Sequence, residues 1–151
     1  MRVQVLSALV LSCAAALFGA QQAMAEQQVT VDTLAHLVAA FNAHDLDAVM
    51  SFFDDNCELM MPRGPDPWGQ RYVGKADVRK GLATRFEGIP DVHYGDVHNW
   101  VSSNHGVSQW TLTGTTRDGK KIKVPGCDLL EFRDGKIIRK DSYWKIVEPT
   151  S

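Results

Sequence analysis

Hydrophobic and polar residues alternate along the last third of the chain. Between Val107 and Trp144, three segments rich in β-forming residues are separated by two Asp-Gly pairs, Asp118-Gly119 and Asp134-Gly135. Asp-Gly between alternating segments is a strong hairpin signal, because glycine tolerates positive φ and aspartate can hydrogen-bond its own backbone. The pattern therefore predicts an antiparallel meander of three strands.

One acidic residue, Asp128, interrupts the apolar face of the middle strand. Strand side chains alternate between faces, and this face carries Ile122, Val124, Gly126, Asp128, Leu130 and Phe132. A carboxylate on such a face needs a partner or a purpose. If Asp118-Gly119 forms a two-residue turn, Asp128 lies opposite Gln109. The outer face then carries Trp110, Leu112 and Leu129.

The register of the last strand has two alternatives. A three-residue loop, 133–135, with a bulge turns inward Ile138, Lys140, Ser142 and Trp144. A two-residue turn instead turns inward Ile137, Arg139, Asp141 and Tyr143. We favour the first alternative, because it buries Ile138 and Trp144 rather than two charged residues. A slip of one residue reverses the face of every side chain.

The first half of the chain has the periodicity of helices. Thr30 or Asp32 can cap a helix that ends near His44, and its apolar residues Leu34, Leu37, Val38 and Phe41 share one face. Asp45 can cap a second, short helix. A third helix is predicted from Lys75 to about Glu87. Other predicted segments are a strand at 57–61, a Pro-rich loop at 63–71 and a strand at 91–102. Helices followed by antiparallel strands indicate an α+β domain with helices on one sheet face.

The first 25 residues have the pattern of a secretory signal peptide. Arg2 precedes an apolar segment, 3–18, and Ala23-Met24-Ala25 is a small-x-small cleavage site. The apolar segment is too short for a stable membrane anchor. We therefore expect residues 1–25 to be removed, and residues 26–151 to form one domain in a periplasmic or secreted protein.

Composition and motifs exclude several classes of protein. The formal net charge is −2 without a basic stripe, which argues against a nucleic-acid partner. The histidines and cysteines lack the spacing of a metal site, and no phosphate-binding or nucleotide motif is present. We therefore predict no metal and no cofactor. In the mature chain, Cys57 and Cys127 could form a disulfide in an oxidising compartment. We favour two separate cysteines, because Cys127 falls on the outer face.

Several local segments resemble the nuclear transport factor 2-like superfamily, in its SnoaL-like branch, which is related to polyketide cyclases and ketosteroid isomerases. The segments that carry the resemblance are 38–47, 53–57, 72–75, 110–115, 126–128 and 132–137. The resemblance covers nearly the whole mature chain. It implies a cone-shaped α+β domain, in which three N-terminal helices pack on a curved antiparallel sheet of mixed order and enclose an apolar cavity. Many members are dimers.

Ketosteroid isomerases allow a comparison by residue. The acid of their oxyanion hole matches Asp128. The tyrosine on their first helix matches Leu37, and their general base matches Met61. Two of the three catalytic positions are therefore apolar, which argues against ketosteroid isomerase chemistry.

Asp128 is the principal candidate for a catalytic residue, with His98 and Gln109 as helpers. Its alternative role is structural, paired with Lys140 or hydrogen-bonded by Gln109. The predicted ligand-binding residues are Met60, Trp68, Tyr72, Tyr143 and Trp144. The outer strip formed by Trp110, Leu112 and Leu129 predicts a homodimer, since exposed apolar strips mark partner surfaces.

Three functions follow from this sequence. The first is a cofactor-independent lyase or isomerase that acts on a small, largely apolar, oxygenated molecule through Asp128. The second is a non-catalytic module that binds a small apolar ligand. The third is a dimeric interaction domain with a vestigial cavity. An open cavity at Asp128 favours the first, an open apolar cavity elsewhere the second, and a filled interior the third.

Overall fold

The computed structural model of the chain describes residues 28–148, so the predicted signal peptide lies outside the described residues. The helices are α1 (Val31–Asn42), α2 (Leu46–Ser51) and α3 (Lys75–Gly88). The strands are β1 (Phe53–Met60), β2 (Arg71–Val73), β3 (His93–Ser102), β4 (His105–Thr115), β5 (Lys121–Arg133) and β6 (Lys136–Trp144). All three helices lie where the periodicity places them, and the short β2 was not predicted.

Both predicted helix caps are present. The Thr30 side chain accepts a hydrogen bond from the backbone N–H of Thr33 at 3.3 Å, and the Thr33 hydroxyl accepts one from the backbone N–H of Thr30. The Asp45 carboxylate accepts from the N–H of Ala48 at 2.9 Å. Each cap satisfies backbone donors that the first helical turn leaves free.

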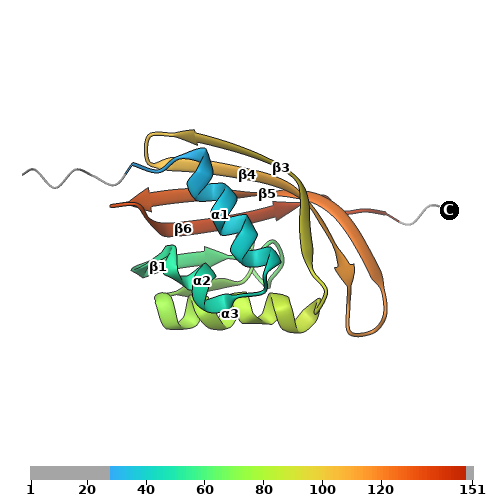
Figure 1. The fold of residues 1–151 in the computed structure, drawn as a ribbon. Coiled ribbons are helices and arrows are strands. Elements are labelled where there is room, and N and C mark those ends of the chain that lie inside the picture. Colours follow the sequence, from blue (N-terminus) through green and yellow to red (C-terminus); the bar gives the residue numbers. More distant parts are fainter. Residues whose placement is uncertain (1–27, 149–151) are drawn as a thin grey trace, which may run out of the picture.

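The strands form one curved, open sheet in the order β2-β1-β6-β5-β4-β3, and Figure 1 shows α1 lying across one of its faces. Neighbouring strands are antiparallel except β1 and β6, which run parallel. The α+β class and the meander of β4 to β6 are confirmed. The sheet is mixed rather than purely antiparallel, because β1 joins the meander beside β6.

The predicted register of the first hairpin is wrong by one residue. Asp128 pairs with Ser108, and Gln109 pairs with Cys127. The turn holds three residues, 117–119, and is closed by backbone hydrogen bonds from Thr116 to Lys120 and from Gly119 to Thr116. The extra residue turns Trp110 and Leu112 inward, where they are 3% and 0% exposed. The predicted outer strip of Trp110, Leu112 and Leu129 therefore does not exist.

In the second hairpin, most of the residues predicted to point inward do so, but the turn is shorter than predicted. Asp134 and Gly135 both have positive φ, at 50° and 74°, and form a two-residue turn that pairs Arg133 with Lys136. Ile137 is consequently buried. A bulge between the Glu131–Arg139 and Phe132–Ile137 pairs then shifts the register. Beyond this bulge, the strand turns inward Lys140, Ser142 and Trp144, as predicted.

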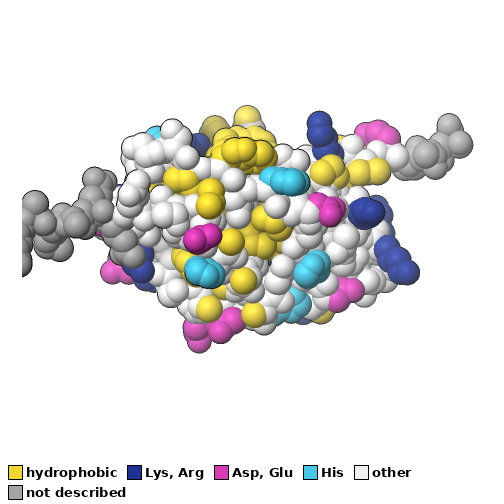
Figure 2. Space-filling view, turned by 45° about the horizontal axis from the view of Figure 1, so that its top comes forward, with side chains coloured by type: hydrophobic (Ala, Val, Ile, Leu, Met, Phe, Trp, Pro, Cys, Tyr) yellow, Lys and Arg dark blue, Asp and Glu magenta, His cyan; other side chains and the backbone are white. Residues whose placement is uncertain are grey.

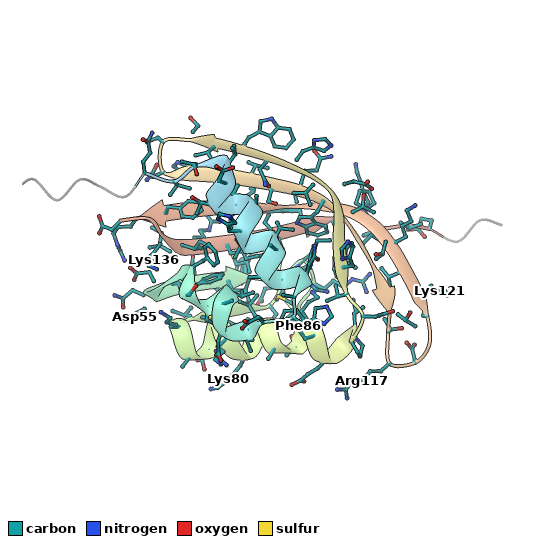
Figure 3. All side chains as sticks on the ribbon, viewed as in Figure 1. Asp55, Lys80, Phe86, Arg117, Lys121 and Lys136 are labelled. Atoms are coloured by element: carbon teal, nitrogen blue, oxygen red, sulfur yellow. The ribbon has the colours of Figure 1, made fainter. Side chains whose placement is uncertain are left out.

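The hydrophobic core lies between the inner sheet face and the helices. Its main cluster combines Leu34 and Phe41 of α1 with Leu82 of α3 and with inward residues of β1 and β5. Figure 3 labels Phe86 of α3, whose ring lies 6.2 Å from that of Phe41. A second cluster gathers around Trp110 and Leu112. Within residues 28–148, no helix has the length and hydrophobicity needed to cross a membrane.

Candidate functional site

Asp128 lies on the inner sheet face, 7% exposed, among three hydrogen-bond donors. Its Oδ1 accepts from Lys140 Nζ at 2.5 Å and from Ser142 Oγ at 2.7 Å. Its Oδ2 accepts from Trp110 Nε1 at 3.1 Å. Lys140 is 5% exposed, so the two opposite charges form a buried ion pair. Of the two structural partners predicted for Asp128, Lys140 is the one that pairs with it in the structure.

The central place of β5 in the sheet brings these groups together. Ser142 is the cross-strand partner of Asp128 on β6, and Lys140 lies one inward position away on the same strand. Trp110 reaches Asp128 from β4 across Gly126, its cross-strand partner. A Cβ atom at position 126 would lie 2.5 Å from the indole. Glycine at this position therefore allows the indole to lie against β5.

A small cavity ends at the Asp128–Lys140 pair. Its walls are Phe41, Met61, Pro62, Leu82, Arg85, Tyr94, Trp110, Asp128, Lys140 and Ser142. The space inside is about 20 Å³, which is enough for about one water molecule. The interior is thus nearly filled, and the space that remains adjoins Asp128 rather than a purely apolar wall.

Tyr94 supplies a second polar group to this cavity. Its ring meets Trp110 edge to face, with 5.1 Å between the centroids. Burial raises the pKa of the Tyr94 hydroxyl well above its ordinary value, partly opposed by the positive charge of Arg85. The hydroxyl makes no hydrogen bond to any residue between 28 and 148. Tyr94 can therefore donate to an oxygen atom of a bound molecule.

Trp144 lies beside Arg85, one of the cavity walls. The guanidinium carbon of Arg85 is 4.7 Å from the Trp144 ring centroid, and that of Arg63 is 5.3 Å away. Both contacts are within the range of cation–π interactions. Trp144 was predicted to bind ligand as a wall of the site; its side chain packs beside Arg85 and does not line the cavity itself.

The structure does not bring His98 and Gln109 to Asp128. The two residues are cross-strand partners on β3 and β4, and both side chains are exposed. Gln109 lies on the outer sheet face because of the one-residue shift described above. A catalytic helper must come within hydrogen-bond reach of the reacting group, so neither residue can assist Asp128 in this arrangement.

The other predicted ligand-binding residues lie away from the cavity. Met60 pairs with Asp141, a residue of the outer face, and it is Met61 that lines the cavity. Trp68 is 55% exposed in the loop before β2. Tyr72 packs against Gly81 of α3. Tyr143 is exposed on the outer face, where its hydroxyl donates to Asp141 at 3.0 Å.

Tyr94 and Arg85 were not predicted as site residues. Alternation along β3 is broken by a bulge between Gly95 and His98, where Asp96 has a φ of 49°. A period of two could not follow the faces through that bulge. Arg85 lies on α3, far from β6 in sequence. Its contact with Trp144 of β6 therefore has no local sequence signal.

The remaining candidates for chemistry are the two cysteines and a metal site. Cys57 is buried on β1, and Cys127 is half-buried on β5; both are free thiols, as we favoured. Between residues 28 and 148, no three His, Cys, Asp or Glu side chains gather in the way a metal ion would require.

The chain belongs to the SnoaL-like domain family, whose model matches residues 34–140. This match confirms the resemblance seen in the local sequence segments. A comparison with curated proteins found no match.

Solved structures share the fold at low sequence identity. A protein from Xanthomonas campestris, assigned provisionally to the polyketide cyclases, is 19% identical, with a TM-score of 0.67 over 76% of this chain and 88% of its own. A protein with a ketosteroid isomerase-like fold from Catenulispora acidiphila, solved in complex with trimethylamine, is 17% identical, with a TM-score of 0.68 over 78% of this chain and 88% of its own. TerC, co-crystallised with polyporic acid, is 18% identical, with a TM-score of 0.66 over 76% and 90%. These similarities establish the fold alone.

Proposed function

We propose that this SnoaL-like protein acts outside the cytoplasm as a cofactor-independent enzyme of the lyase or isomerase type. Its substrate is a small, largely apolar, oxygenated molecule that binds in the cavity at Asp128. Bound small molecules in the Catenulispora acidiphila and TerC structures support a ligand site in this fold. The cone-shaped enclosure implied by the family resemblance is consistent with this proposal.

One observation carries the proposal, namely the unequal environment of the two carboxylate oxygens of Asp128. Oδ1 accepts from both Lys140 and Ser142, whereas Oδ2 accepts only from the indole of Trp110. A carboxylate has about four acceptor sites, two on each oxygen. Oδ2 can therefore accept one more hydrogen bond or a proton. Burying two charges has a penalty of several kcal/mol per ion. A pair retained beside a cavity suggests a role other than packing.

The proposed chemistry is proton transfer next to a carbonyl group. Asp128 Oδ2 takes a proton from carbon, and the C–H electron pair moves into the bond toward the carbonyl carbon. The negative charge develops on the carbonyl oxygen, where the neutral Tyr94 hydroxyl donates a hydrogen bond. Asp128 then returns the proton to another atom of the substrate, so no external reactant is consumed.

A non-catalytic binding module is the second candidate. About 20 Å³ leaves no room for either a substrate or a ligand unless side chains move. Leu37 occupies the position at which ketosteroid isomerases have their tyrosine, which favours binding without that chemistry. Met61 also occupies the position at which ketosteroid isomerases have their base.

Asp128→Asn is expected to lower turnover by at least about 100-fold, the lower range for losing a general acid or base. Native mass spectrometry of protein purified from the periplasm of its host would first identify the retained ligand. Conversion of that ligand by the wild type and by the variant would then be measured. The matched control is Asp141→Asn, which changes an equally buried carboxylate on the outer face and should leave turnover unchanged. A ligand that the wild type retains without converting would favour the binding module instead.

We also propose that the outer sheet face pairs with a second copy of the chain. Its apolar centre is formed by Trp100, Val107 and Leu129, which are aligned across β3, β4 and β5. Beside them, Arg139 lies between Glu131 and Asp141. A face that carries both signs of charge around an apolar centre can pair with itself about a two-fold axis.

Leu129→Glu is expected to convert the dimer to a monomer, because it places a charge on a side chain that is 43% exposed at this centre. Light scattering at micromolar concentration would measure the mass. Val31→Glu, a comparably exposed apolar position on α1, is the control and should stay dimeric. A monomeric wild type would refute the proposal.

A further inference from the structure

Two arginines, Arg63 and Arg85, stand apart from the others within residues 28–148. Four of the remaining arginines form ion pairs with carboxylates, namely Arg71, Arg79, Arg133 and Arg139. Arg117, labelled at the lower edge of Figure 3, donates to the backbone carbonyl of Glu87. The guanidinium groups of Arg63 and Arg85 make no hydrogen bond or ion pair with any described residue.

The same indole holds both of these arginines. Their guanidinium carbons lie 5.3 Å and 4.7 Å from the Trp144 centroid, so at most about 10 Å separates the two charges. Arg63 comes from the loop after β1, and Arg85 comes from α3. Because the two like charges lie this near each other, an anion placed near both guanidinium groups is attracted by both.

One of the two arginines, Arg85, adjoins the cavity. Arg85 forms part of the cavity wall together with Tyr94 and Asp128. The charge of Lys140 is already matched by that of Asp128, so Arg63 and Arg85 are a local excess of positive charge. Figure 2 shows hydrophobic, acidic, basic and histidine side chains intermixed over one face of the molecule. The formal net charge of the chain is −2, so the two arginines are not part of an overall excess of positive charge.

We propose that Arg63 and Arg85 bind a carboxylate group of the ligand, and that the ligand is an apolar carboxylic acid. The proposal rests on the proposed function and adds the class of substrate. Guanidinium groups bind carboxylates through paired, charge-assisted hydrogen bonds. The carboxylate lies beside Trp144, the apolar part of the ligand enters along Tyr94 and Trp110, and its far end meets Asp128 Oδ2.

Binding of such an acid requires side chains of the cavity wall to move, because the space inside is about 20 Å³.

Benzoate and its neutral analogue benzamide test the proposal by NMR titration of the wild-type protein. The indole N–H signals of Trp144 and Trp110 report the mouth and the inner end of the cavity. We expect benzoate to shift both signals and to bind at least about tenfold more tightly than benzamide. Arg85→Gln and Arg63→Gln should each weaken benzoate binding by about tenfold and leave benzamide binding unchanged.

The control variant is Arg79→Gln on the same helix, whose guanidinium pairs with Asp47 at 2.7 Å. It should bind benzoate as the wild type does. Equal affinity for benzoate and benzamide, with the Trp110 signal shifted by both, would overturn the carboxylate proposal and leave the cavity as a ligand site. If neither compound shifts the Trp110 signal, both this proposal and the proposed function are overturned. If Arg79→Gln weakens benzoate binding as much as Arg85→Gln, general surface charge accounts for the binding, and the proposed site is refuted.

Discussion

Removing either charge of the Asp128–Lys140 pair is expected to destabilise the fold by about 3–5 kcal/mol, because the remaining charge stays buried without a partner. The two side chains are 7% and 5% exposed, and 2.5 Å separates Oδ1 from Nζ. Asp128→Asn and Lys140→Met are the variants of choice. Asn keeps an acceptor for the Trp110 indole, and Met has nearly the length of lysine. Denaturant unfolding of each variant measures the loss.

The double variant Asp128→Asn with Lys140→Met should recover most of that stability, since an apolar replacement of a buried ion pair is often neutral or stabilising. It also separates folding from function, because a folded protein without the carboxylate should still fail to convert the ligand. Lys80 and Asp77 provide the control pair on α3. Their side chains are largely exposed, so the corresponding cycle should give a much smaller coupling energy. Additive losses at the buried pair would contradict the expected coupling.

Local signals were sufficient to predict the class of the fold. The caps at Thr30 and Asp45 and the stop at Gly88 depend on neighbouring residues, and the helices begin and end near them. Two Asp-Gly pairs placed both hairpins of the meander. The parallel contact between β1 and β6 could not be predicted, because it joins segments about 80 residues apart and has no local signature.

The register depended on details that an Asp-Gly pair does not specify. At Asp118-Gly119, hydrogen bonds between Thr116 and Lys120 close a loop of three residues, and this single added residue moved Trp110 from the outer face to the core. At Asp134-Gly135, the turn has two residues, but a bulge restored the predicted faces beyond Ile138. Turn length and bulges together set the register, and neither was predicted correctly here.

The candidate site was predicted in part for the same reason. Asp128 could be identified because β5 has regular alternation on both sides of it. Lys140 and Ser142 could be identified because their strand is the next one along the chain. Tyr94 and Arg85 could not, because a bulge interrupts β3 and because α3 reaches β6 only through tertiary packing. Helpers assigned by register alone, such as Gln109, were displaced by the shift of one residue.

The site combines costly electrostatics with little free space. A buried ion pair alone is weak evidence for stability, since apolar residues of similar volume would serve packing as well. Here the pair adjoins a tyrosine hydroxyl and an arginine that have no hydrogen-bonding or acidic partner among residues 28–148. Together they provide an acceptor, a donor and an anion-binding group along one path. An oxygenated acid could satisfy all three groups at once.

Leu112→Ala distinguishes the two registers of the β4–β5 hairpin directly. Leu112 is 0% exposed in the second hydrophobic cluster, so its truncation should destabilise the protein by about 2–5 kcal/mol. In the register with a two-residue turn, Leu112 would lie on the outer face. The same change would then weaken the dimer, so that light scattering gives a reduced mass, with little loss of stability. Gln109→Ala is the matched control on the same strand. Its side chain is exposed on the outer face, so the change should stay within about 0.5 kcal/mol. Denaturant unfolding and light scattering of both variants decide between the registers. A stable Leu112→Ala variant with reduced mass would contradict the three-residue turn. It would also contradict the inward position of Trp110, which the candidate site requires.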